Sequence, residues 1–242
     1  MATETTGDAA APIKPKALRP RDAATLILCD RSRGALRVLM GKRNERQKFM
    51  PGKFVFPGGA VDVADRKMNV AGPLDEVVER KLLTRTKQTS SDYARGLALA
   101  AIRETFEETG LAVGVTDVGA PEATPSEAWR RFAATGVFPA LDGLDFLARA
   151  VTPPGRPRRF DARFFVADAA LVAHEEKNVV GPEAEFVELA WKTLDEALAL
   201  DIPNITRMVL GDLAALAAGP VDKFRARPFY RQINKKQLQE AL

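Results

Sequence analysis

Disulfide-forming residues, metal-binding histidines and long apolar runs are nearly absent from the 242-residue sequence, and each absence excludes a class of function. Cys29 is the single cysteine, so no disulfide forms within the chain and a reducing cytoplasm is the expected compartment. His174 is the single histidine, which excludes a metal site built from several histidines and suggests a surface residue. No apolar run approaches the ~20 residues of a membrane-spanning helix, so no membrane partner is expected.

Concentrated basic charge is also lacking. The chain carries 36 Lys and Arg against 32 Asp and Glu, a net charge of +4, and the basic residues are scattered along it. This pattern favours an anionic small molecule over a nucleic acid as the partner. Residues 1–20 show no signal-peptide layout and are expected to form a flexible tail. Residues 21–242 are expected to form a single domain, since 46% of the chain is hydrophobic.

Strand and helix patterns alternate along this domain. Branched and aromatic residues bounded by turn signals predict strands over 25–30, 36–42, 54–56, 111–115, 144–154, 158–168 and 185–193. Helical periodicity predicts helices over 74–83, 92–109, 126–136, 194–200 and 204–219. The fold class is therefore α+β, a mixed sheet sandwiched between helices, with a helical extension over about 194–242.

The helix over 92–109, capped by Ser91 or Asp92 and ended by Gly110, crowds Glu104, Glu107 and Glu108 into its last turns. A helix C-terminus carries about half a negative charge, so each carboxylate there is disfavoured by roughly 0.3–1 kcal/mol. Arg103 reaches Glu107 one turn on but leaves two carboxylates unmatched. A solvated acidic face is one interpretation. The other is a bound Mg²⁺ or Mn²⁺, since these ions prefer oxygen ligands and glutamates at i, i+3 and i+4 share a face.

The stretch "RETFEETGL" (103–111) together with "FPGGAVDVAD" (56–65) resembles the catalytic box of the Nudix hydrolase family. The box expects a glutamate where this chain has Asp65, and an aliphatic residue where it has Thr105. The two halves, which the family keeps close together, are separated here by an insertion of about 30 residues, over about 66–91. The insertion begins in a loop and ends before the helix, where added length is tolerated.

The resemblance implies the Nudix fold and hydrolysis of the pyrophosphate in a nucleoside diphosphate linked to another group. By the same resemblance Glu104, Glu107, Glu108 and the Gly58 carbonyl bind Mg²⁺ or Mn²⁺, and Gly59 lies beside the substrate. Arg103 is expected to orient Glu107.

Other acidic residues remain open as site residues. The general base is either Glu104 or an acid from a distant loop, with Glu183 and Glu185 as candidates. Asp62 and Asp65 are either metal contacts or solvated loop acids.

The substrate is less defined by the sequence. "LMGKRNERQKFMPGKFVFPGG" (39–59) resembles the motif that precedes the box in coenzyme A diphosphatases, so Arg43 and Lys48 are candidate phosphate contacts. Solvated strand-end charges are the simpler interpretation of both. An alternative function is a Nudix-fold nucleotide-binding or regulatory module without hydrolysis. A homodimer is compatible with the sequence, and the insertion could form either a lid or a dimer contact.

Overall fold

The computed structural model describes residues 18–219, 222–233 and 236–242. In these residues the strands are β1 (Arg21–Asp30), β2 (Arg37–Arg43), β3 (Phe54–Val55), β4 (Gly58–Ala60), β5 (Leu111–Val113), β6 (Asp145–Val151), β7 (Phe160–Asp168), β8 (Val172–Glu175), β9 (Phe186–Thr193), β10 (Pro228–Ile233) and β11 (Lys236–Ala241). The helices are α1 (Glu76–Leu83), α2 (Ser91–Thr109), α3 (Glu127–Ala133), α4 (Leu194–Ala199) and α5 (Asn204–Ala217), with short 3-10 helices η1 (Val63–Lys67) and η2 (Ala169–Leu171).

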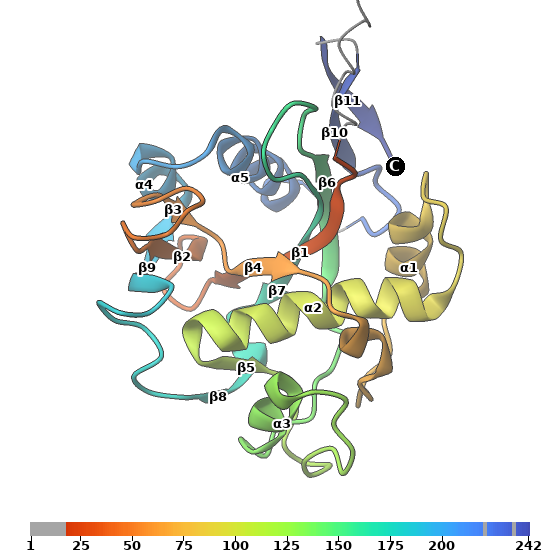
Figure 1. The fold of residues 1–242 in the computed structure, drawn as a ribbon, viewed down its shortest axis with the longest axis vertical. Helices are drawn as coiled ribbons and strands as arrows, with labels where there is room; N and C mark the ends of the chain where they lie inside the picture. The colour runs from red at the N-terminus through yellow and green to blue at the C-terminus, as the bar shows by residue number, and fades with distance from the viewer. Residues whose placement is uncertain (1–17, 220–221, 234–235) are drawn as a thin grey trace, which may run out of the picture.

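The described strands form a nine-stranded mixed sheet and a separate pair, β5 with β8. The large sheet runs β11-β10-β6-β7-β1-β2-β3, while β4 pairs with β1 and β9 pairs with β2. The central contact is parallel, with β1 lying along β7 from Arg21 opposite Phe160 to Cys29 opposite Asp168. Figure 1 shows α2 crossing one face of this sheet and α5 the other. The architecture is the α+β sandwich that the sequence predicts.

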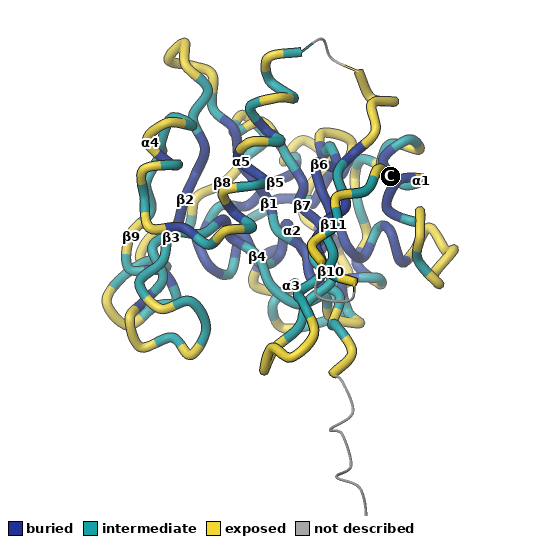
Figure 2. The backbone as a smooth tube through the Cα atoms, turned by 90° about the horizontal axis from the view of Figure 1, so that it is seen from above, coloured by how far each residue is buried: buried dark blue, intermediate teal, exposed yellow. Residues whose placement is uncertain are grey.

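Alternation along β1 fills both sides of the sheet. Leu26 and Leu28 pack in the core beneath α2, whereas Ile27 and Cys29 pack in the core beneath α5. This follows from the period of two in a strand, which sends successive side chains to opposite faces. The buried segments accordingly gather at the centre of the molecule, and the exposed ones lie in the peripheral loops (Figure 2).

Helix α2 runs through the core and has sharp ends. It begins one residue earlier than predicted, because the Ser90 hydroxyl accepts a hydrogen bond from the Tyr93 N–H and caps the first turn. It ends as predicted at Gly110, which has φ 80° and donates its N–H to the Phe106 carbonyl. Among the described residues, no helix is both long and apolar enough to cross a membrane.

The C-terminal prediction is wrong in its last part. Helices α4 and α5 are present, but the chain then forms the antiparallel strands β10 and β11, which add to the edge of the large sheet beside β6. The sequence signal for a strand is weak in this hairpin, because polar residues occupy both faces of β11 and do not alternate with apolar ones. Most of the predicted tail over 1–20 lies outside the described residues, and β1 begins at Arg21.

The insertion packs against this C-terminal segment. Its helix α1 buries Val78 and Leu82 beside the N-terminal half of α2. The Lys81 ammonium donates to the carbonyl oxygens of Lys223 and Arg225, the latter at 2.9 Å. The insertion therefore lies at the opposite end of α2 from the glutamates (Figure 1), and it is not placed as a lid over them.

Candidate active site

Strand β4 joins the two halves of the interrupted box in space. It pairs with β1 through Thr25 opposite Gly58 and Ala24 opposite Gly59. One residue further on, the Ala60 carbonyl accepts a hydrogen bond of 3.0 Å from the Arg103 guanidinium on α2. The glycine stretch and the glutamate helix are thus neighbours despite the insertion between them.

Glu108 is the most deeply placed of the three glutamates. It is buried, and one of its carboxylate oxygens accepts a 2.8 Å hydrogen bond from the Gly58 N–H. Burial raises the pKa of Glu108 well above its ordinary value, and the nearby Glu185 charge raises it further. The backbone bond and Arg43 act in the opposite direction. A cation beside this carboxylate would remove most of the cost of ionising it.

Glu104 lies directly against Gly59. A Cβ atom at residue 59 would stand 2.5 Å from the carboxylate carbon of Glu104, closer than real side chains approach. A side chain at residue 59 would therefore have to displace the Glu104 carboxylate. Burial raises the pKa of Glu104 to about 7, while Arg103 partly counteracts this shift.

Glu107 is the most open member of the group, with 35% of its side chain exposed. Its carboxylate accepts a 2.5 Å hydrogen bond from Nη1 of Arg103, and the same nitrogen donates to Glu104 at 2.9 Å. Arg103 thus lies against Glu107, as expected from the sequence, and holds Glu104 as well. Its neighbouring carboxylates raise the pKa of Arg103 despite the opposing effect of burial, so its charge is permanent.

The two loop acids differ: Asp62 is an exposed loop acid, whereas Asp65 is not solvated. Asp65 is fully buried and accepts hydrogen bonds from Arg103 Nε at 2.8 Å and Nη2 at 3.0 Å. Asp62 caps η1 through the Ala64 N–H. Asp65 therefore acts on Arg103, and its lone pairs are already occupied.

The donor atoms of the site fit a hard divalent cation. Glu104, Glu107 and Glu108 supply carboxylate oxygens from one helix, and Glu104 and Glu107 share the single cation Arg103 while Glu108 is buried. Within the described residues, no group of three Asp, Glu, His or Cys side chains is positioned to hold a metal ion. Magnesium commonly takes only one or two carboxylates and completes its shell from substrate phosphates and water, so an open carboxylate set suits it.

The other candidate residues differ in exposure and in ion pairing. Arg43 is occupied, since it pairs with Glu185 at 2.8 Å and donates Nε to the Phe49 carbonyl. Glu185 acts electrostatically on Glu108 and lies on the site side, whereas Glu183 is 79% exposed and pairs with Arg46. Lys48 is exposed.

Sequence reasoning missed the contact between Trp129 and Asp65. The indole N–H of Trp129 donates to Asp65 at 3.0 Å, and both side chains are fully buried. Trp129 lies well outside the box, and only the apolar face of α3 marks it as a core residue. No local pattern connects it to Asp65. His174 lies exposed on β8, which agrees with the prediction of a surface residue.

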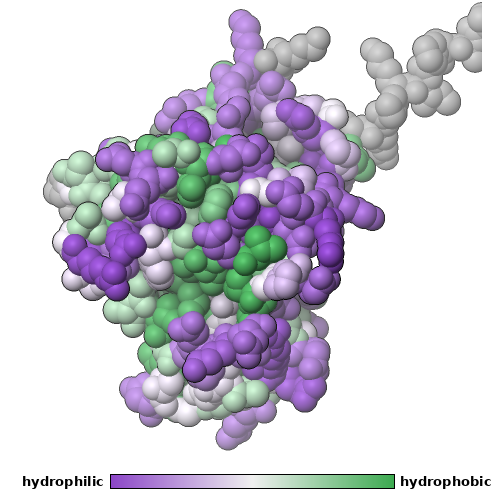
Figure 3. All heavy atoms as spheres, turned by 90° about the vertical axis from the view of Figure 1, so that its left-hand side faces the viewer, coloured by the Kyte–Doolittle hydropathy of each residue, from purple (hydrophilic) through white to green (hydrophobic). Residues whose placement is uncertain are grey.

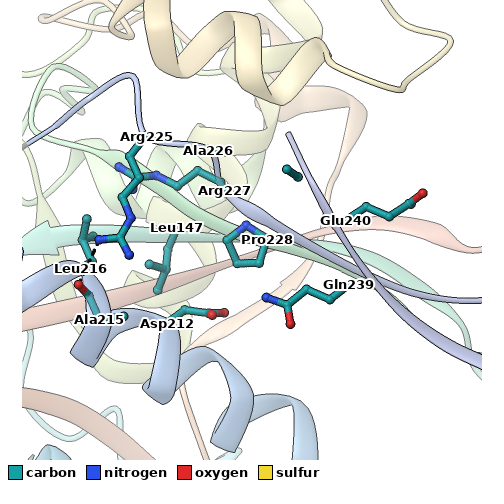
Figure 4. A pocket seen from close by; sticks show the side chains of 11 residues that line it. Leu147, Asp212, Ala215, Leu216, Arg225, Ala226, Arg227, Pro228, Gln239 and Glu240 are labelled. Atoms are coloured by element: carbon teal, nitrogen blue, oxygen red, sulfur yellow. Dashed lines mark hydrogen bonds between the residues drawn. The ribbon is translucent and has the colours of Figure 1, made fainter.

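A cavity that lies away from the glutamates is found near the C-terminal strands. It has a volume of about 510 Å³ and lies between α5 and the β10–β11 hairpin (Figure 4). Its polar lining includes Asp212, Arg225 and Gln239, but Asp212 accepts from the Tyr230 hydroxyl and Arg225 donates to the Ala215 carbonyl. We assign the candidate site from its chemistry and not from cavity size.

The fold and the site together define a class of proteins. A mixed sheet lies between helical layers, and a glycine strand faces a helix whose last turns present clustered glutamates. This is the strand-loop-helix carboxylate site that the resemblance implies.

The comparisons with known proteins agree with this class. No protein-family model matches the chain. The chain is 30% identical over 193 residues to a Caenorhabditis elegans protein provisionally named nudix hydrolase 7, covering 74% of this chain and 55% of that protein. It therefore spans about half the length of this relative.

The solved structures point to the same family. A Nudix hydrolase from Alicyclobacillus acidocaldarius is 27% identical with a TM-score of 0.61, over 81% of this chain and 92% of that one. RenU, a Nudix hydrolase from M. smegmatis, is 18% identical with a TM-score of 0.41, over 82% and 86%, which is too distant to support a conclusion. In sequence and in fold the chain is therefore similar to Nudix hydrolases.

Proposed function

We propose that the chain is a divalent-metal-dependent hydrolase that cleaves the pyrophosphate of a nucleoside diphosphate linked to another group. The observation that carries the proposal is the placement of the buried Glu108 against Gly58 and of the mostly buried Glu104 against Gly59, where Arg103 and Arg43 are also engaged by Glu107 and Glu185. Folding alone does not favour two ionisable carboxylates in such a place. A bound cation, Mg²⁺ or Mn²⁺, makes the arrangement favourable.

We assign the residues of the site to two roles, metal binding and proton transfer. Glu104, Glu107, Glu108 and the Gly58 carbonyl would hold the metal, which when bound lowers the pKa of water and neutralises phosphate oxygens. Arg103 orients Glu104 and Glu107. The proton acceptor is either Glu104, whose pKa of about 7 suits a base at neutral pH, or Glu185 across the site.

Coenzyme A and its thioesters are the substrate class that we propose first. The motif before the box supports it, with exposed Lys48 as the phosphate contact. Arg43 could contact a substrate phosphate only if its ion pair with Glu185 were broken. Figure 3 shows that the side of the molecule where the glutamate end of α2 lies carries an apolar strip between hydrophilic margins. Such a surface suits a ligand with both charged and apolar parts. A cytoplasmic location and a homodimer belong to the same proposal.

A substrate panel tests the activity. Coenzyme A thioesters, NADH, ADP-ribose, dinucleoside polyphosphates and modified nucleoside triphosphates are incubated with Mg²⁺ or Mn²⁺ and the products identified by mass spectrometry. A 3′,5′-ADP product supports the coenzyme A class, and its absence from coenzyme A reactions refutes that class. Tight nucleotide binding without any product would instead support a binding module.

Two substitutions test the residues. We expect Glu107→Gln and Glu108→Gln each to lose most activity while the protein stays folded. Glu127→Gln is the matched control, because Glu127 is an exposed helical glutamate that, among the residues the structure describes, pairs with Arg130 alone. Full activity in both site variants contradicts the proposal.

A further inference from the structure

The Asp65 carboxylate is held from every side. It accepts four hydrogen bonds, two from Arg103, one from the Trp129 indole at 3.0 Å and one from the Asp62 N–H at 2.8 Å. An ionised carboxylate offers about four acceptor positions, so all of them are used. The position of this carboxylate is therefore fixed by its donors, and Trp129 is the donor that comes from outside the box.

Packing fixes the direction of the Trp129 N–H. The ring is fully buried and meets Phe132 edge-to-face, with centroids 5.3 Å apart. Phe132 in turn meets Phe106 of α2 edge-to-face at 5.2 Å. The short helix α3 that carries Trp129 is capped by Ser126. Because the ring cannot shift without disturbing this aromatic cluster, its N–H is a rigid reference point for Asp65.

We propose that Trp129 is a positioning residue that acts through Asp65 on Arg103. With Nε and Nη2 of Arg103 held by Asp65, Nη1 is left to hold Glu104 at 2.9 Å and Glu107 at 2.5 Å. Asp65 stands at the sequence position where the family box expects the longer glutamate, and Trp129 donates to this shorter side chain. This inference rests on the proposed hydrolase function, because it is Glu104 and Glu107 whose placement the pair controls.

The first test is Trp129→Phe, which removes the N–H and keeps an aromatic ring. We expect kcat to fall about 10–100-fold with KM little changed, as for other residues that orient metal-binding groups. The control is Trp191→Phe on β9, which packs against the same core but has no contact with Asp65 among the described residues. Equal kcat in the two variants would overturn the proposal.

The second test lengthens the Asp65 side chain, first with Trp129 present and then with phenylalanine in its place. Asp65→Glu alone adds a methylene to a filled site and should lose about tenfold or more in kcat, even though it restores the expected family residue. In the Trp129→Phe background the smaller ring leaves space for the longer side chain, so activity should partly recover relative to Asp65→Glu alone. Full activity of Asp65→Glu with Trp129 present contradicts the proposal. This single variant also carries the test if Trp129→Phe does not fold.

A measurement independent of turnover separates this inference from the proposed function. The Mn²⁺ concentration at the midpoint of thermal stabilisation should rise about 10–100-fold in Trp129→Phe and stay unchanged in Trp191→Phe. Unchanged midpoints in both would overturn the positioning role. If the wild type neither turns over diphosphates nor binds Mn²⁺, the proposed function fails. The positioning pair is then judged by whether Trp129→Phe and Asp65→Glu are non-additive in thermal unfolding, and additivity refutes it.

Discussion

Replacing Gly59 by alanine should separate activity from stability. The new Cβ would lie 2.5–2.7 Å from the carboxylate atoms of Glu104, and ordinary contact begins at 3.4 Å, so this carboxylate must retreat by about 1 Å. A displacement of that size is expected to cost about 100-fold in kcat, equivalent to ~2.7 kcal/mol in the activation barrier. The atoms that move end a flexible side chain, so we expect the unfolding free energy to change by less than about 1 kcal/mol.

The assay compares three glycine variants by steady-state hydrolysis and thermal unfolding. Gly58→Ala should instead lose stability, because its Cβ would meet the Ala24 carbonyl oxygen at 2.5 Å and the Thr25 backbone at 2.7 Å. Gly181→Ala has no atom within 4 Å of the new Cβ and should retain both properties. Wild-type kcat in Gly59→Ala would refute the assignment of the Glu104 carboxylate to the reacting centre.

Three further outcomes are expected. With a chelator present, the free energy of unfolding should fall as pH rises from 4.5 to about 7, by up to ~3 kcal/mol, because folded Glu104 keeps its proton where the unfolded chain has lost it. Denaturation at both pH values measures this, and Glu104→Gln should reduce the trend to the part that Glu108, whose pKa burial also raises, contributes. Lys81→Met leaves the Arg225 carbonyl without its donor and should cost ~1–3 kcal/mol in chemical denaturation while kcat is retained. Thr105→Val removes a 2.7 Å bond to the Ala101 carbonyl inside a helix and should change stability by less than ~1 kcal/mol, and a loss above ~2 kcal/mol contradicts this.

Local sequence signals located the framework well. The Ser-Ser-Asp stretch and Gly110 marked the ends of α2 to within a residue, because caps depend on side chains adjacent in the chain. The apolar, branched run over 25–30 likewise predicted the strand β1. The glutamates and the glycine pair were found because their spacing is itself the signal.

Contacts between distant segments were not readable in the same way. The bond between Asp65 and Trp129 depends on α3 packing against α2, and no spacing encodes it. The choice between Glu183 and Glu185 required the loop geometry that turns one toward Glu108 and the other toward solvent. The β10–β11 hairpin was missed because its pairing with β6, more than its own alternation, stabilises it.

The turn between α1 and α2 offers a place to cut the chain without separating the reacting groups. Residues 84–90 are mostly exposed, whereas the two halves of the box are joined by the bond from the Gly58 N–H to Glu108 and the bond from Arg103 to the Ala60 carbonyl, and the segments before and after the turn are joined by the β1–β7 ladder. A protease that nicks this turn should therefore leave two fragments that stay associated and keep their glutamates in place. The same turn can accept a fluorescent or affinity label, and the protein could be reassembled from two separately expressed pieces.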